Sequence, residues 1–102
     1  MLEKDIEAAM GKALKAQGCM WLKFVSPGCA AVPDRICITA EGRVVFLELK
    51  TITGRLTPLQ EQMIKEMRKH HAEVEVVYGM EQAMAFVESV APARAQQGGR
   101  AK

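Results

Sequence analysis

A run near the middle of the chain reads Val44-Val45-Phe46-Leu47-Glu48-Leu49-Lys50. Alternation leaves apolar residues on both faces of this run, which predicts a central strand with a polar patch at its C-terminal end. Glu48 is the exception, because burying an unpaired carboxylate in a strand costs free energy. Lys50 lies two residues after Glu48, and therefore points to the same face of the strand.

A second acidic residue belongs to the same pattern. Val32-Pro33-Asp34 leads into a predicted strand at residues 34–39, and residues 40–43 form a turn before the strand at residues 44–51. If the turn centres on residues 41 and 42, Asp34 pairs near position 49, within one residue of Glu48. Two adjacent carboxylates favour a cation between them, and oxygen ligands suit Mg²⁺ or Mn²⁺. The alternative is a surface carboxylate pair that forms a salt bridge with Lys50.

The remaining elements follow from apolar periodicity and from helix-start signals. We expect helices at residues 2–17 and 80–90, and strands at residues 19–25 and 74–78. Thr57-Pro58-Leu59-Gln60 is a capping box that begins another helix, which ends near residue 70 or 71. The inward stripe predicted for that helix is Leu59, Met63, Ile64 and Met67. The order α-β-β-β-α-β-α predicts an α/β fold with a mixed central sheet flanked by helices.

The bulk composition sets further bounds. A chain of 102 residues predicts one domain at residues 1–90, followed by a disordered tail at residues 91–102. Residues 1–90 carry 11 basic and 12 acidic side chains, so DNA contacts must come from local patches. Three cysteines without zinc-binding spacing indicate free thiols in a reducing cytoplasm. The N-terminus is too polar to begin a signal peptide, and no membrane contact is expected.

A third carboxylate is expected from the first helix. Glu3 falls within about 60° of the centre of the apolar arc, whereas Glu7 falls about 100° away, at its edge. Glu3 is therefore the acid expected to point towards the sheet and complete the site. A solvated acid that complements the helix dipole is the alternative for Glu3.

These residues resemble a known family. Pro33-Asp34 with Glu48-Leu49-Lys50 is similar to the PD-(D/E)xK nuclease motif of restriction-endonuclease-like folds. Glu3-x-x-Ile6, Gly28-x-x-x-Val32-Pro33-Asp34 and Gly54-Arg55-Leu56-Thr57-Pro58-Leu59-Gln60 narrow the resemblance to stand-alone VRR-NUC domains of phages and prophages. The resemblance covers residues 3 to about 88.

The resemblance implies a role for each matching residue. Asp34, Glu48, Glu3 and the backbone carbonyl of Leu49 would hold Mg²⁺ or Mn²⁺. Lys50 would be the catalytic lysine that, with the cation, orients a water to attack the phosphodiester. Gln60 would reach the metal water or a phosphate, although its pattern is equally that of a capping-box residue.

The same resemblance implies a function. The chain would be a metal-dependent endodeoxyribonuclease that cuts branched DNA such as Holliday junctions. It would act as a homodimer without a nucleotide cofactor, in the cytoplasm of a bacterial host that carries the phage or prophage. The alternatives are a non-catalytic DNA-binding module that keeps the fold, an enzyme acting on RNA or nucleotides, and a restriction-type nuclease.

Several other side chains are secondary candidates. Lys23, Arg35, Arg43 and Arg55 could contact phosphates, with Arg55 favoured because it precedes a helix N-terminus. The loop at Ser26-Pro27-Gly28 could bring backbone amides near a phosphate. His70 and His71 at a helix end are attributed to the helix dipole, and Cys37 to the core.

Overall fold

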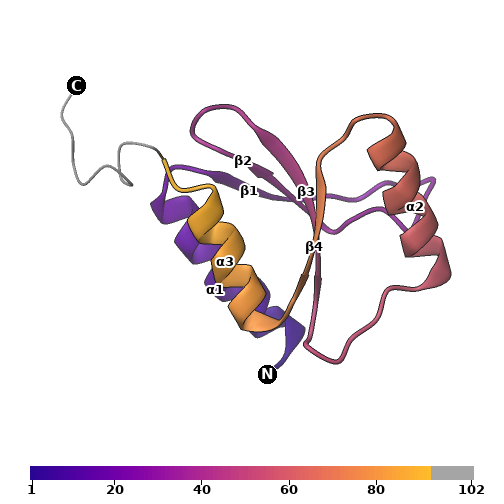
Figure 1. Ribbon diagram of the computed structural model, residues 1–102, viewed down its shortest axis with the longest axis horizontal. Coiled ribbons are helices and arrows are strands. Elements are labelled where there is room, and N and C mark those ends of the chain that lie inside the picture. Colours follow the sequence, from indigo (N-terminus) through magenta and orange to yellow (C-terminus); the bar gives the residue numbers. More distant parts are fainter. Residues whose placement is uncertain (93–102) are drawn as a thin grey trace.

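The computed structural model describes residues 1–92 (Figure 1). The elements along the chain are α1 (Glu3–Ala16), β1 (Met20–Lys23), β2 (Arg35–Ile38), β3 (Val44–Lys50), α2 (Pro58–Lys69), β4 (Val74–Tyr78) and α3 (Gly79–Ser89). The predicted order α-β-β-β-α-β-α is therefore confirmed. Residues 93–102, which make up most of the predicted disordered tail, lie outside the described residues.

The four strands form one mixed sheet in the order β1-β2-β3-β4. Strands β1, β2 and β3 make an antiparallel meander, and α2 carries the chain across so that β4 pairs with β3 in parallel. The predicted α/β fold class and the central place of residues 44–50 are confirmed. The strands expected at residues 19–25 and 34–39 are shorter than expected.

The core lies on one face of the sheet, beneath α1 and α3. These two helices run side by side in Figure 1, and both pack on the same side of the sheet, α1 against β1 and β3 and α3 against β4. The face of β3 that meets them carries Val45, Leu47 and Leu49, all of them buried. The helices contribute Ile6, Met10, Leu14, Ala83, Phe86 and Val87 to the same cluster.

Helix α1 approaches the sheet closely because it carries a glycine at the contact. A Cβ atom at Gly11 would lie 2.6 Å from both Cδ1 and Nε1 of Trp21 on β1. Distances this short are excluded by van der Waals repulsion, so a larger side chain would push the helix and the indole ring apart. Gly11 thus helps to fix how closely the middle of α1 lies against β1.

Helix α2 packs on the opposite face, mainly against β4 (Figure 1). Its predicted capping box is present: the Gln60 N–H donates to Thr57 Oγ1 at 3.1 Å, and the Thr57 N–H donates to Gln60 Oε1 at 2.9 Å. Ile64 is buried, but the inward position predicted for Leu59 is wrong, because Leu59 is 68% exposed. Leu59 and Ile64 are five positions apart in the chain, which places them about 140° apart around the helix.

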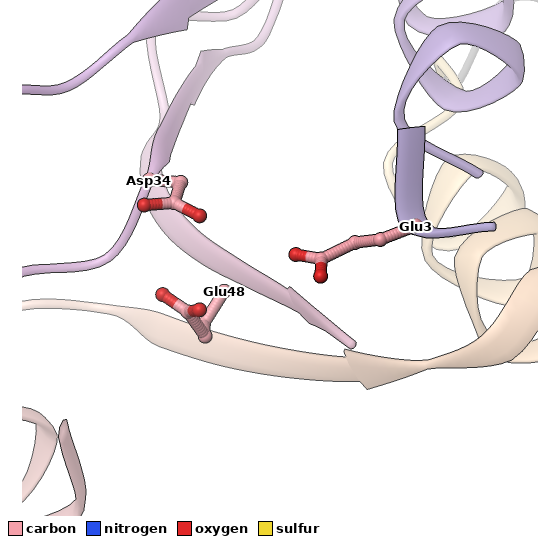
Figure 2. Close-up of side chains that lie close together, drawn as sticks. All are labelled: Glu3, Asp34 and Glu48. Carbon is pink, nitrogen blue, oxygen red and sulfur yellow. The ribbon is translucent and has the colours of Figure 1, made fainter. Parts of the chain in front are cut away.

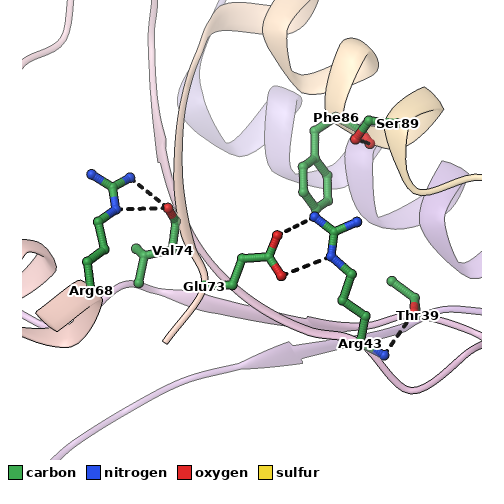
Figure 3. A network of polar contacts seen from close by, with 7 residues as sticks. All are labelled: Thr39, Arg43, Arg68, Glu73, Val74, Phe86 and Ser89. Atoms are coloured by element: carbon green, nitrogen blue, oxygen red, sulfur yellow. Dashed lines mark hydrogen bonds and ion pairs between the residues drawn. The ribbon is translucent and has the colours of Figure 1, made fainter. Parts of the chain in front are cut away.

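Side chains cap the free edge of β4. The Arg68 guanidinium donates to the Val74 carbonyl through Nε at 3.3 Å and Nη2 at 2.6 Å, as Figure 3 shows. At the other end, the Tyr78 N–H donates to Gln82 Oε1 at 2.9 Å. Because edge strands with free backbone groups invite pairing with other chains, these caps reduce the length of β4 that is open to such pairing.

We predict that two leucines respond very differently to truncation. Leu47→Ala removes a fully buried side chain from the centre of β3 and should lower the free energy of unfolding by about 2–5 kcal/mol. Leu59→Ala should change it by less than about 0.5 kcal/mol, because the side chain is mostly in solvent. Urea denaturation followed by circular dichroism would check both values, and a large loss in Leu59→Ala would contradict the exposed position.

Candidate metal centre

Three carboxylates from separate parts of the chain converge at one point. Each of Glu3, Asp34 and Glu48 offers a carboxylate oxygen, and these oxygens all lie within 4.8 Å of one another (Figure 2). Glu3 extends from the first turn of α1, Asp34 immediately precedes β2, and Glu48 lies in β3. Glu48 is only 2% exposed, whereas the other two are exposed to solvent. The cluster is therefore buried on the side of Glu48 and open to solvent on the side of Glu3 and Asp34.

The hairpin register places Asp34 beside Glu48. Arg35 pairs with Leu47, so the residue before β2 comes opposite Glu48 rather than opposite position 49. This register is set by the turn, where the Thr39 N–H donates to the Arg43 carbonyl at 2.8 Å. The difference of one position stays within the range expected from the sequence.

The structure separates the two acids of α1. Glu3 joins the carboxylate cluster, as the helix-face argument predicts. Glu7 instead forms an ion pair with Arg35, whose guanidinium lies 5.1 Å from the centroid of the Trp21 ring. The sequence placed Glu7 at the edge of the apolar arc but gave no sign of this partner, which comes from a strand 28 residues away.

Burial sets the protonation of Glu48. It raises the pKa of this carboxyl to about 7, and the nearby carboxylates of Asp34 and Glu3 act in the same direction. The Lys50 ammonium and a backbone hydrogen bond from Asp34 oppose the rise. Lys50 Nζ lies 3.8 Å from Glu48 Oε2, so the predicted proximity of these two side chains is present.

Gln60 has the capping-box role that its sequence pattern allows, and it also contacts the carboxylate cluster. Its Oε1 atom completes the capping box at the start of α2. Its Nε2 atom donates to Glu48 Oε2 at 3.4 Å. The cap therefore holds the amide in a position from which its other end reaches the buried carboxylate, and the site draws on α2 as well as on the hairpin.

The backbone of Leu49 is directed towards the same region. The Phe46 N–H bonds to the Glu73 carbonyl, so even-numbered residues of β3 direct their backbone groups to β4. Leu49 consequently directs its carbonyl to the other side, where β2 would lie. Strand β2 begins only at Arg35, opposite Leu47. The Leu49 carbonyl therefore points past the start of β2, on the side where Asp34 lies.

The candidate DNA contacts differ in their availability. Lys23 is exposed at the end of β1, and Arg55 is exposed between β3 and α2. Ser26 is half-buried in the loop that follows β1. Arg35 is half-buried and engaged with Glu7 and Trp21, which reduces its availability to a phosphate. Arg43 forms a bidentate ion pair with Glu73, as Figure 3 shows, at the far end of the hairpin from Asp34.

The histidine at the end of α2 and the buried cysteine lie outside the carboxylate cluster, at the helix end and in the core where the sequence placed them. His70 is the C-cap residue of α2, and its Nδ1 atom lies 2.9 Å from the Glu66 carbonyl. All three cysteines are free thiols. Burial raises the pKa of the Cys37 thiol to about 12, so this thiol stays protonated at neutral pH. A protonated thiol in the core is a poor nucleophile.

The donor set suits a hard divalent cation. Its side-chain donors are carboxylate oxygens, which Mg²⁺ and Mn²⁺ prefer over softer nitrogen and sulfur ligands. Burial and the neighbouring carboxylates both disfavour the ionised form of Glu48 and raise its pKa. A bound cation would favour the ionised form, and the three converging carboxylates fit the metal expected from the sequence.

The pKa of Glu48 leads to a prediction on stability. Because the folded-state pKa of about 7 lies above the ordinary value of 4.5, this group stabilises the fold at pH below 4.5 and loses that contribution as pH rises to 7. Glu48→Gln removes the titration. Without added metal, the stability of the variant relative to the unmodified protein should therefore increase as the pH is raised from 5 to 8, by roughly 1–3 kcal/mol in total.

Urea denaturation of both proteins at a series of pH values, in EDTA, would measure this difference. Subtracting one profile from the other cancels every other titrating group. A difference that stays constant from pH 5 to pH 8 would contradict the raised pKa. Adding Mn²⁺ at pH 8 should stabilise the unmodified protein more than Glu48→Gln.

Comparisons with known proteins identify the family of the chain. A solved structure described as a VRR_NUC domain superposes with a TM-score of 0.79 at 25% sequence identity, covering 84% of this chain and 94% of that one. "Putative nuclease p44" of Acyrthosiphon pisum secondary endosymbiont phage 1 is 36% identical over 58 residues, which are 57% of this chain and 62% of the phage protein. The family model for the VRR-NUC domain matches residues 2–81. The chain therefore belongs to the VRR-NUC family of nuclease domains.

Proposed function

We propose that the chain is a metal-dependent endodeoxyribonuclease that hydrolyses DNA phosphodiester bonds. The observation that carries this proposal is the convergence of Glu3, Asp34 and Glu48, with the Lys50 ammonium 3.8 Å from the Glu48 carboxylate. Membership of the VRR-NUC family supports it, as does the similarity to a phage protein named as a nuclease. We assign the activity to a single domain at residues 1–90.

Each residue of the site has a proposed task. Asp34, Glu48, Glu3 and the Leu49 carbonyl would hold Mg²⁺ or Mn²⁺. The bound cation would act as a Lewis acid towards the phosphate and help to generate a nucleophile from water. Lys50 would hold the attacking water and stabilise charge that develops on the phosphate oxygens.

Gln60 is proposed as a positioning residue. Its amide donates to the same Glu48 oxygen, Oε2, that the Lys50 ammonium approaches. A neutral donor and a cation on one oxygen together restrict how the Glu48 carboxylate can rotate. The capping box in turn holds Gln60, so the start of α2 orients the buried ligand.

The substrate is proposed to be branched DNA, including Holliday junctions, cut by a homodimer. This part rests on the family resemblance, since a twofold dimer presents two sites suited to opposed strands. Lys23 and Arg55 are the proposed phosphate contacts with exposed side chains. Ser26 and Arg35 lie nearer to the interior and would contribute after a local rearrangement.

We further propose that the protein acts in the cytoplasm of a bacterial host and is encoded by a phage or prophage. The phage relative and the three free thiols support this placement. Across residues 1–92, none of the helices combines the length and the apolar character needed to cross a membrane.

We predict metal-dependent cleavage that depends on the cluster. The unmodified protein should cut labelled DNA in Mg²⁺ or Mn²⁺ and not in EDTA. Asp34→Asn, Glu48→Gln and Lys50→Ala should each lower the cleavage rate by roughly 1,000-fold or more, because several kcal/mol of transition-state stabilisation are lost. Four-way junction, flap, duplex and single-stranded DNA, with an RNA duplex alongside, would rank the substrates.

Glu41→Gln is the matched control, because it removes the same charge from the exposed hairpin turn, at the end opposite Asp34. It should cut at the unmodified rate. Binding of DNA without any cleavage, by folded protein in either metal, would instead identify a non-catalytic binding module. Preference for RNA would overturn the assignment to DNA.

A separate prediction distinguishes the two acids of α1. Glu3→Gln should weaken activation by Mn²⁺ by roughly 10–100-fold, because one charged oxygen leaves the cluster. Glu7→Gln should retain most of the activity, since Glu7 is paired with Arg35 outside the cluster. Titrating the cleavage rate against Mn²⁺ concentration would measure both effects. Loss of activity in Glu7→Gln alone would show that the wrong acid was assigned.

A further inference from the structure

A groove lies beside the carboxylate cluster, and the metal site leaves it unused. It runs between α2 and the loop that joins β1 to β2, and its volume is about 590 Å³. Pockets of this size hold small organic groups. The loop contributes Ala30 and Ala31 to its walls, and α2 contributes Leu59, Gln62 and Met63. We call this space the α2 groove.

Gln60 joins the α2 groove to the cluster. Its side chain lines the groove, and its Nε2 atom donates to Glu48 Oε2 at 3.4 Å. The capping box formed with Thr57 holds the first turn of α2, which also carries Leu59. Only one side chain therefore separates the groove from the buried carboxylate, so one DNA strand can place a phosphate at the cluster and a neighbouring group in the groove.

The charge of the walls argues against a phosphate in the groove. Phosphates are held mainly by Lys and Arg side chains. Within the described part of the chain, no residue that lines the groove is a lysine or an arginine, and Glu66 adds a negative charge at its rim. The walls instead combine apolar side chains with the neutral amide of Gln62, which offers both donors and an acceptor. A nucleobase has matching properties, because it is uncharged, has two flat faces and carries hydrogen-bonding groups on its edge.

The exposure of Leu59 points to the same occupant. This side chain is 68% exposed, although the capping box fixes the backbone that carries it. It contributes little to the packing of α2, whose buried residue is Ile64. Leu59 and Met63 are four residues apart, so they lie on one face of the helix and form one apolar wall. Unstacked bases are held against apolar side chains of this kind.

We propose that the α2 groove binds one unpaired nucleobase of the strand that is cut, beside the scissile phosphate. The inference rests on the proposed function and names the feature of the substrate that the site selects. A base inside a duplex must be unpaired and unstacked before it enters the groove, and this cost is smallest where the base is already unpaired. The groove therefore gives a physical reason for a preference for flaps and branch points over intact duplex.

The test measures binding without cleavage. The full chain carrying Asp34→Asn would be titrated into labelled flap DNA in Mg²⁺, with affinity followed by fluorescence anisotropy. A series of DNAs would each lack a single base at one position near the branch. Removing the base that occupies the groove should weaken binding by roughly 5–150-fold, because stacking on a side chain contributes that much per base. Removing bases elsewhere should have little effect.

A substitution of Leu59 completes a thermodynamic cycle with the missing base. Leu59→Ala, in the same Asp34→Asn chain, should weaken binding of the complete flap by a similar factor. It should leave the affinity for the DNA that lacks the groove base unchanged, because both changes remove the same contact. Leu59→Phe keeps an apolar surface and should retain tight binding.

Met20→Ala is the matched control. It truncates a comparably exposed apolar side chain, 52% exposed, which pairs with Ile38 at the end of the sheet opposite Asp34. It should leave every affinity unchanged, and circular dichroism would confirm that each variant is folded. Equal weakening by Leu59→Ala on DNA with and without the base would overturn the proposal. Unchanged affinity of Leu59→Ala for every DNA would overturn it as well.

Failure of this proposal is distinguishable from failure of the proposed function. The binding cycle contains no cleavage step, so it decides the occupant of the groove even if the unmodified protein cuts no DNA. With Asp34 intact, Leu59→Ala should still cut DNA in Mn²⁺ but lose most of its preference for flap over duplex. An unchanged preference in this variant would leave the nuclease in place and overturn the role of the groove.

Discussion

The organisation of this domain depends on one buried carboxylate. Glu48 lies in the central strand with 2% of its surface exposed, where an unpaired charge is costly. Lys50, Gln60 and the Asp34 backbone each reach it, and they come from β3, from the start of α2 and from the residue before β2. Three elements thus depend on one another through a group that is unfavourable to bury alone.

The two faces of the sheet have different roles: one forms the core, and the other carries the buried carboxylate of the cluster. Leu47 and Leu49 face α1 and α3 and form the core, while Glu48 points to the side that α2 only partly covers. Helix α1 contributes to both, because its first turn sends Glu3 to the cluster while Ile6 enters the core. The close approach of Gly11 to Trp21 therefore matters to the site as well as to packing.

The sequence alone predicted the element order, the capping box and the proximity of Asp34 to Glu48. These depend on local periodicity and on a short hairpin, whose register is limited by its turn. The position of Leu59 was mispredicted because periodicity gives an apolar arc but not which part of it meets the sheet. The pairing of Glu7 with Arg35 could not be predicted, since it depends on the angle at which α1 crosses the strands.

The charge of the site explains why the binding of DNA and the binding of a cation would be coupled. Residues 1–90 carry 11 basic and 12 acidic side chains, so the domain as a whole offers DNA no net attraction. The cluster adds three carboxylates at the point where a phosphate would have to lie, and a single ammonium at Lys50 cannot reverse their sign. A divalent cation in the cluster changes the local charge by two units, so it would favour the phosphate as much as the phosphate favours the cation. The DNA affinity of the metal-free domain would then come from flanking residues such as Lys23 and Arg55, not from the cluster.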